Sequence, residues 1–132
     1  IIAEKAGSPV GLATYFLNTT SIEVVTLNSL ITGIGIGKKL IRSLIHKAKI
    51  NNLERIWLIT TNDNTGALTF YQKLGFHIVR IYPDAISKSR ILKPEIPLIG
   101  EHGIPIRDEI ELELKLLQQP PVLPTGSDSF SS

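Results

Sequence analysis

The sequence lacks several residue types on which whole classes of protein depend. It contains no cysteine, which excludes disulfides, thiolate metal sites and cysteine nucleophiles. No apolar run approaches the roughly 20 residues that a membrane-spanning helix needs. Glu4 and Lys5 also interrupt the apolar start that a signal peptide requires. We therefore expect a cytoplasmic protein that makes no contact with a membrane, and we assign no metal ligands.

Methionine is absent as well, and the chain starts at Ile1, so we expect an N-terminal portion of the native protein to be missing. What is present is a globular composition: 132 residues, of which 42% are apolar and 20% are charged. This composition predicts one domain with a real core over residues 1–117. Residues 118–132 are rich in Pro, Gly and Ser without periodicity and predict a disordered tail.

Acidic residues are missing from one long stretch. Residues 24–53 contain no Asp or Glu, although the whole chain carries a net charge of only +2. A basic segment on an otherwise balanced chain indicates a local anion site. No aromatic platform lies among the lysines, so nucleic-acid binding is not expected. The basic residues of this segment are Lys38, Lys39, Arg42, Lys47 and Lys49.

The order of the hydrophobic patterns predicts an α+β domain with a mixed sheet. Residues 37–52 repeat their apolar residues about every 3.6 positions, and residues 64–75 form a shorter helix with candidate caps at both ends. Residues 109–116 alternate with the period of a half-buried strand. They follow a Pro-rich loop over residues 93–108. The other predicted strands are residues 1–7, 9–18, 21–30, 55–61 and 76–83.

Three glycines stand at the start of the basic helix, in the sequence TGIGIGKK of residues 32–39. A dinucleotide fingerprint requires G-x-G-x-x-G, and a Walker A loop requires four residues between its glycines, then Lys and Ser or Thr. Neither pattern is present. Two interpretations remain. The run is either a plain turn before a helix with a solvated basic face, or a turn whose amides bind a pyrophosphate, with Lys38 and Arg42 adding charge.

A second motif lies one strand downstream, in NTGALTFYQKLGF of residues 64–76. Together the two motifs resemble the GNAT acetyltransferase superfamily. The family's acyl-CoA signature, Gln/Arg-x-x-Gly-x-Gly/Ala, is matched from Thr32 to Gly37, although Thr32 stands where Gln or Arg is usual. The family's later motif, Asn-x-x-Ala-x-x-Phe-Tyr-x-x-Leu-Gly-Phe, is matched at Asn64, Ala67, Phe70, Tyr71, Leu74, Gly75 and Phe76.

The resemblance implies a GNAT-like mixed sheet flanked by helices, with acetyl-CoA bound where two parallel strands splay apart. The family normally begins with a strand and two helices that help to wall the acceptor site, and we expect this chain to lack them. The resemblance also implies the residues that bind the cofactor. Leu27, Ser29 and Asn64 are expected to contact the pantetheine arm, and Lys73 the 3′-phosphate. The pyrophosphate is expected at the backbone amides of Ile34, Gly35, Ile36, Gly37 and Lys38, and Thr32 and Gly33 belong to the same cofactor-binding turn.

Tyr71 matches the family's usual general acid. A phenol has a pKa near 10, so it stays protonated at neutral pH and can donate a proton to a departing thiolate. The alternative is a core tyrosine that packs beside Phe70. Glu23, on the strand before the glycines, is the candidate general base. Its alternative is a plain surface residue, and many members of the family use ordered water as the immediate base.

The resemblance therefore implies an acetyl-CoA-dependent N-acetyltransferase that moves an acetyl group directly to a primary amine. The acceptor is a small molecule or a peptide, and a homodimer is left open. The alternative is a non-catalytic acyl-CoA-binding module or a truncated acetyltransferase. Tyr71 favours catalysis, whereas the missing N-terminal helices favour the alternative.

Overall fold

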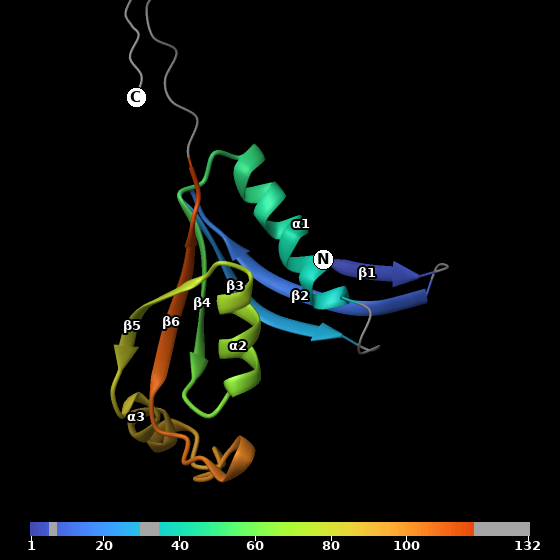
Figure 1. The fold of residues 1–132 in the computed structure, drawn as a ribbon. Coiled ribbons are helices and arrows are strands. Elements are labelled where there is room, and N and C mark those ends of the chain that lie inside the picture. The colour runs from blue at the N-terminus through green and yellow to red at the C-terminus, as the bar shows by residue number, and fades with distance from the viewer. Residues whose placement is uncertain (6–7, 30–34, 118–132) are drawn as a thin grey trace, which may run out of the picture.

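The computed structural model describes residues 1–5, 8–29 and 35–117, which form a mixed sheet with helices packed against it (Figure 1). The predicted α+β class is therefore confirmed. The predicted tail, residues 118–132, lies outside the described residues. The strands are β1 (Ile2–Lys5), β2 (Ser8–Leu17), β3 (Ser21–Ser29), β4 (Arg55–Thr61), β5 (His77–Tyr82) and β6 (Glu109–Lys115).

The strands of the described residues lie in the order β1-β2-β3-β4-β6-β5. β1, β2 and β3 form an antiparallel meander, and β4 then runs parallel to β3. The last strand, β6, is inserted between β4 and β5 and is antiparallel to both. Because β3 and β4 are parallel neighbours, the chain must cross over between them, and helix α1 provides this connection.

Helix α1 (Ile36–Ile50) buries the apolar stripe that the sequence pattern predicts. Lys47 and Lys49 lie in its last turn, where positive charge interacts favourably with the helix dipole. The backbone amide of Asn51 ends the helix by donating to the carbonyl oxygens of Lys47 and Lys49. The buried residues of the helix are Ile36, Leu40, Ile41, Leu44 and Ala48.

Helix α2 (Thr65–Lys73) starts at the cap residue Asn64, and the chain leaves it through Gly75, whose φ of 101° favours glycine. Its buried Tyr71 and the following Phe76 belong to the same core cluster as the buried residues of α1. The two helices therefore pack on one face of the sheet. The opposite face carries exposed apolar side chains, including Phe16 at 67% exposure, and among the described residues no helix covers it.

One helix was not predicted. Residues 85–92 form helix α3 (Ala85–Leu92), which lies beyond the ends of β5 and β6 (Figure 1). It escapes sequence reasoning because only Ile86 is buried, so there is no apolar stripe to detect. It is held instead by polar contacts: the guanidinium of Arg90 donates to the carbonyl oxygens of Ile96, Pro97 and Ile106.

The segment after α3 is the predicted loop, with a short 3-10 turn, η1 (Glu101–Gly103), at its tip. No helix in the described part of the chain combines the length and apolar character needed to cross a bilayer.

Candidate active site

β3 and β4 are paired over a short distance and then diverge. Their register joins Ser21 with Arg55, Ile22 with Ile56, and Glu23 with Trp57, and no later pair is formed among the described residues. A bulge helps to bend β3 away from β4. Thr14 on β2 faces Thr26 while the next residue, Tyr15, faces Val24, so Val25 is the extra residue of β3.

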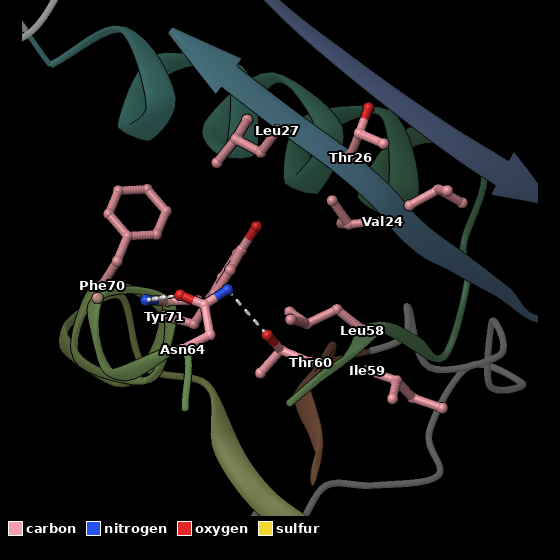
Figure 2. Close-up of a pocket in the computed structure, with 12 residues that line it drawn as sticks. Val24, Thr26, Leu27, Leu58, Ile59, Thr60, Asn64, Phe70 and Tyr71 are labelled. Carbon is pink, nitrogen blue, oxygen red and sulfur yellow. Dashed lines mark hydrogen bonds between the residues drawn. The ribbon is translucent and has the colours of Figure 1, made fainter. Parts of the chain in front are cut away.

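A cavity of about 410 Å³ lies between the diverging strands and the first two turns of α2 (Figure 2). Its walls combine the side chains of both strands with those of the helix. Tyr71 is the one residue of this lining that titrates. The residues that line the cavity are Val24, Val25, Thr26, Leu27, Leu58, Ile59, Thr60, Asn64, Gly66, Ala67, Phe70 and Tyr71.

Asn64 links the end of β4 to the start of α2. Its Oδ1 accepts a hydrogen bond of 3.1 Å from the amide of Ala67, which caps the helix. Its Nδ2 donates to Oγ1 of Thr60 at 3.0 Å (Figure 2). A side-chain amide carries two N–H donors, so the second one has no partner among the described residues and is available at the cavity.

Tyr71 packs in the core and also faces the cavity. Its ring makes edge contacts with Phe70 and Phe76, at centroid distances of 5.0 and 5.2 Å, and the residue is 5% exposed. Burial raises the pKa of its phenol to about 12, which keeps the proton on at neutral pH. The ring extends into the space between β3 and β4 (Figure 2), and its hydroxyl forms no hydrogen bond with a described residue.

The start of α1 lies close to this cavity. Gly35 is its cap residue, with a φ of 72°, and no side chain caps the helix. The first turn contains no acidic residue, and the amides of Ile36, Gly37 and Lys38 precede the first intrahelical bond, from Lys39 to Gly35. Such a helix N-terminus has the free donors and the dipole that anions require.

The structure gives a packing reason for glycine at position 37, which the sequence alone did not show. A Cβ at Gly37 would lie 3.4 Å from Cζ of Phe70 and 3.5 Å from Cδ2 of Leu27. Gly37 therefore lets α1 approach the wall of the cavity, where these two side chains lie.

The structure brings some of the predicted residues together and leaves others apart. Leu27, Asn64 and Tyr71 line the cavity, and Gly35, Ile36, Gly37 and Lys38 form the adjoining helix start. Lys73 is exposed in the last turn of α2, and Glu23 lies on β3; neither lines the cavity. Thr32, Gly33 and Ile34 lie outside the described residues, and of Ser29 the structure describes the backbone as the end of β3.

Sequence reasoning missed several wall residues. Thr60 and Leu58 belong to a continuous apolar strand with no alternation to show which side chains face a ligand. Val24 and Thr26 are separated by the bulge residue, which breaks the regular period of two. The motif included Phe70, but only as a packing neighbour of Tyr71.

A second cavity, of about 400 Å³, lies elsewhere on the sheet and is strongly charged. Nη1 of Arg55 lies 2.8 Å from carboxylate oxygens of both Glu111 and Glu113, and Tyr82 donates to Glu111 at 2.8 Å. Burial raises the pKa of Glu111, but the hydrogen bonds from Arg55 and Tyr82 outweigh it and hold the pKa below its usual range. We call Arg55, Tyr82, Glu111 and Glu113 the polar cluster.

Both sequence and fold lead to one family. Residues 1–76 match the Acetyltransferase (GNAT) family. The chain belongs to this family. The uncharacterized protein YdhI of Bacillus subtilis (strain 168) is 45% identical to it over 106 residues, which cover 80% of this chain and 66% of YdhI. This chain thus spans just under two thirds of the length of that relative.

Solved structures with the same fold include two acetyltransferases crystallised with a cofactor. A GNAT family acetyltransferase from Elizabethkingia anophelis with acetyl-CoA bound has a TM-score of 0.75 and 26% identity, over 87% of this chain and 74% of that chain. A Bacillus subtilis acetyltransferase in complex with CoA has a TM-score of 0.74 and 29% identity, over 88% of this chain and 75% of that chain.

Proposed function

We propose that this chain carries the acetyl-CoA site and the general acid of an N-acetyltransferase that transfers acetyl directly to a primary amine. The observation that carries the proposal is the position of Tyr71: a buried phenol whose hydroxyl faces the cavity between β3 and β4. Family membership and the neighbours crystallised with acetyl-CoA or CoA support the choice of cofactor.

The described residues fit this cofactor at both ends. The start of α1 offers amide donors without a nearby carboxylate, which suits a pyrophosphate. The cavity is uncharged and is lined by apolar groups with a few polar ones, which suits a pantetheine arm. Leu27 would contact the arm, and the free N–H of Asn64 would donate to one of its amide carbonyls. Lys38 and Lys73 would add charge near the phosphates.

Bound acetyl-CoA would supply an activated acetyl group in the form of a thioester. The residues of the chain would then position it and manage the protons. Tyr71 would hold its proton until negative charge develops on the sulfur, because its raised pKa opposes ionisation. It would then donate that proton to the leaving thiolate. No residue of the described lining offers a base to deprotonate the amine, so Glu23, which lies outside the lining, would act through an ordered water.

The described lining of the cavity contains no carboxylate that could recognise an amine, and Tyr71 is its one titrating residue, so the lining does not select one class of acceptor. A small-molecule amine, a lysine side chain and a peptide N-terminus each remain candidates. This same shortage of acid–base groups favours one alternative, a non-catalytic acyl-CoA-binding module.

The test is a titration with acetyl-CoA followed by a panel of amines. Acetyl-CoA at about 100 times its dissociation constant should stabilise the fold by about 2.7 kcal/mol, read as a rise in Tm. Thiol release is then followed with a polyamine, a lysine-containing peptide blocked at its N-terminus and a free-N-terminus peptide without lysine. No stabilisation by acetyl-CoA contradicts the proposal. Stabilisation without transfer to any amine supports the binding module instead.

The homodimer and the cytoplasmic location also remain proposals. β5 ends the described sheet and pairs with β6 alone, and Ile78 and Ile81 on it are exposed. An edge strand with apolar side chains is open to pairing with a second copy. The mass in solution by light scattering tests the dimer, and cell fractionation tests the location.

A further inference from the structure

Asp63 is a buried carboxylate that the proposed chemistry does not use. It is 5% exposed, and its Oδ2 accepts a hydrogen bond of 3.1 Å from the amide of Glu101. Its Oδ1 has no hydrogen-bond partner in the described part of the chain. Burial raises the pKa of Asp63, but hydrogen bonds from the Thr61 side chain and the backbone amide of Glu101 outweigh it and hold the pKa below its usual range, so the folded chain keeps this carboxylate ionised.

Asp63 lies in the turn of residues 60–64, whose residues have two roles. Thr60 and Asn64, at its two ends, line the cavity. Asn62 and Asp63, between them, hold the segment after α3. Oδ1 of Asn62 accepts from the amides of Arg107 and Asp108 at 3.0 Å, and its Nδ2 donates to the carbonyl oxygen of Pro105 at 2.9 Å.

The segment held by this turn is a compact loop of residues 98–106. The amide of Gly100 donates to the carbonyl oxygen of Ile104 at 2.8 Å, and the amide of Ile106 donates to that of Leu98 at 2.9 Å. These two hydrogen bonds give the loop a fixed shape of its own. Figure 1 shows it beyond the end of β4, next to the start of α2.

Gly100 fits tightly over the carboxylate of Asp63. A Cβ at Gly100 would overlap Oδ2 of Asp63 and would lie 2.6 Å from its Cγ. The φ of Gly100 is −108°, which lies outside the left-handed region that favours glycine. Close approach to Asp63 and to Ile106, whose Cγ1 would lie 2.7 Å away, is what requires it.

We propose that Asp63 is a positioning residue that locks the 98–106 loop to the turn after β4 and thereby fixes the direction of the Asn64 side chain in the cavity. The proposal rests on the proposed function in one respect: the effect on Asn64 is measured as a change in the dissociation constant of acetyl-CoA. The loop, its glycine and Asp63 then form a support for the site, although none of them lines the cavity.

Four variants test the lock, with acetyl-CoA as the ligand. Gly100→Ala and Asp63→Ala should each raise the dissociation constant about three- to tenfold, the usual scale of coupling between neighbours. Asp63→Asn keeps an oxygen acceptor for the amide of Glu101 and should stay within about twofold. Glu101→Ala is the matched control, because it removes an exposed side chain and keeps the backbone amide that donates a hydrogen bond to Asp63.

The decisive measurement repeats Gly100→Ala in an Asn64→Ala background. If the lock acts through Asn64, Gly100→Ala has no further effect on acetyl-CoA binding once Asn64 is gone. If Gly100→Ala only loosens the fold, the losses of binding free energy caused by Gly100→Ala and Asn64→Ala add, and the proposal is overturned. Loss of binding in the Glu101→Ala control also overturns it.

Amide hydrogen exchange provides a second readout that needs no cofactor. Gly100→Ala should speed exchange at Glu101, which donates to Asp63, and at Ala67, which donates to Asn64. Faster exchange at Glu101 with unchanged exchange at Ala67 overturns the lock. A wild-type chain that fails to bind acetyl-CoA contradicts the proposed function, and the lock is then judged by exchange at Ala67.

Discussion

Two regions of the sheet each hold a tyrosine with a raised pKa, and the cause differs between them. In the cavity between β3 and β4, burial raises the pKa of Tyr71. In the polar cluster, the pKa of Tyr82 is raised mainly by the hydrogen bond that its hydroxyl donates to the carboxylate of Glu111. Tyr82 has therefore already committed its proton to a partner in the chain, whereas Tyr71 has not done so among the described residues.

The difference teaches that a raised pKa does not by itself identify a general acid. A proton donor must also be free and must point to where charge develops. Tyr71 has no hydrogen-bond partner among the described residues and faces an uncharged cavity, as the proposed role of general acid requires. The polar cluster is closed on itself: Arg55 pairs with two carboxylates, and Tyr82 donates to one of them. Its main contribution is to hold β4, β5 and β6 together.

The largest expected effect separates the two tyrosines directly. Tyr71→Phe keeps the ring and its packing but removes the proton, so kcat should fall about 100-fold or more while the dissociation constant of acetyl-CoA stays within about twofold. Tyr82→Phe is the matched control and should leave kcat within about twofold. Equal losses of kcat in Tyr71→Phe and Tyr82→Phe would contradict a special role for the Tyr71 proton.

The polar cluster should show its role in stability. Arg55→Met leaves Glu111 and Glu113 without their cation, and the free energy of unfolding at pH 7 should fall by about 2 kcal/mol. Urea denaturation measures this change. Arg42→Met, an exposed change on α1, is the control and should stay within about 0.5 kcal/mol. A loss of kcat in Arg55→Met larger than its loss of stability explains would assign chemistry to the cluster.

The cluster also predicts a dependence on pH. The pKa of Glu111 lies below its ordinary value of 4.5, so its ionised form is favoured in the folded state. The stability that it contributes is present above about pH 4.5 and is lost as the pH falls through its folded pKa. Wild type should therefore lose stability between about pH 5 and pH 3, and Arg55→Met should lose less over that window. An equal slope in both proteins would remove Arg55 as the cause.

A graded pair of variants tests how closely α1 approaches the cavity. Gly37→Val should weaken acetyl-CoA binding about tenfold or more, because its methyl groups would push against Phe70 and Leu27. Gly37→Ala places one methyl group at tight van der Waals distance and should cost less than about threefold. Isothermal titration measures both constants. Similar losses from Ala and Val would mean that the surroundings of Gly37 do not decide its size.

The smallest effect divides the two roles of Asn64. Asn64→Ala removes the cap of α2 and should cost about 1 kcal/mol of stability. Asn64→Asp keeps a capping oxygen but removes the amide donors, so stability should hold while acetyl-CoA binding weakens about tenfold. Full affinity in Asn64→Asp would assign Asn64 to the cap alone.

The sequence predicted those parts of the fold that have a local pattern. The apolar stripe of α1 and the alternation of β6 identified both elements to within two residues, and the motif around Tyr71 located α2. α3 was missed because its ends are fixed by contacts of Arg90 and Asp84 rather than by an apolar face. The lock at Asp63 could not be predicted, since it joins residues 38 positions apart in the sequence.

Part of the cavity lining could also be predicted from local spacing. Asn64 and Tyr71 both line the cavity, and Asn64 caps the helix that carries Tyr71. The wall of β3 depends on a bulge at Val25, and a bulge arises from pairing with β2 rather than from any feature of β3 alone.

The insertion of β6 between β4 and β5 sets the order in which this sheet can be completed. β5 pairs with no other described strand, so it stays unpaired until Glu109–Lys115 leave the ribosome. Until then β4 and β5 each present an edge of unpaired backbone N–H and C=O groups, which can pair with another chain. Docking of β6 therefore closes the edges of β4 and β5 in one step.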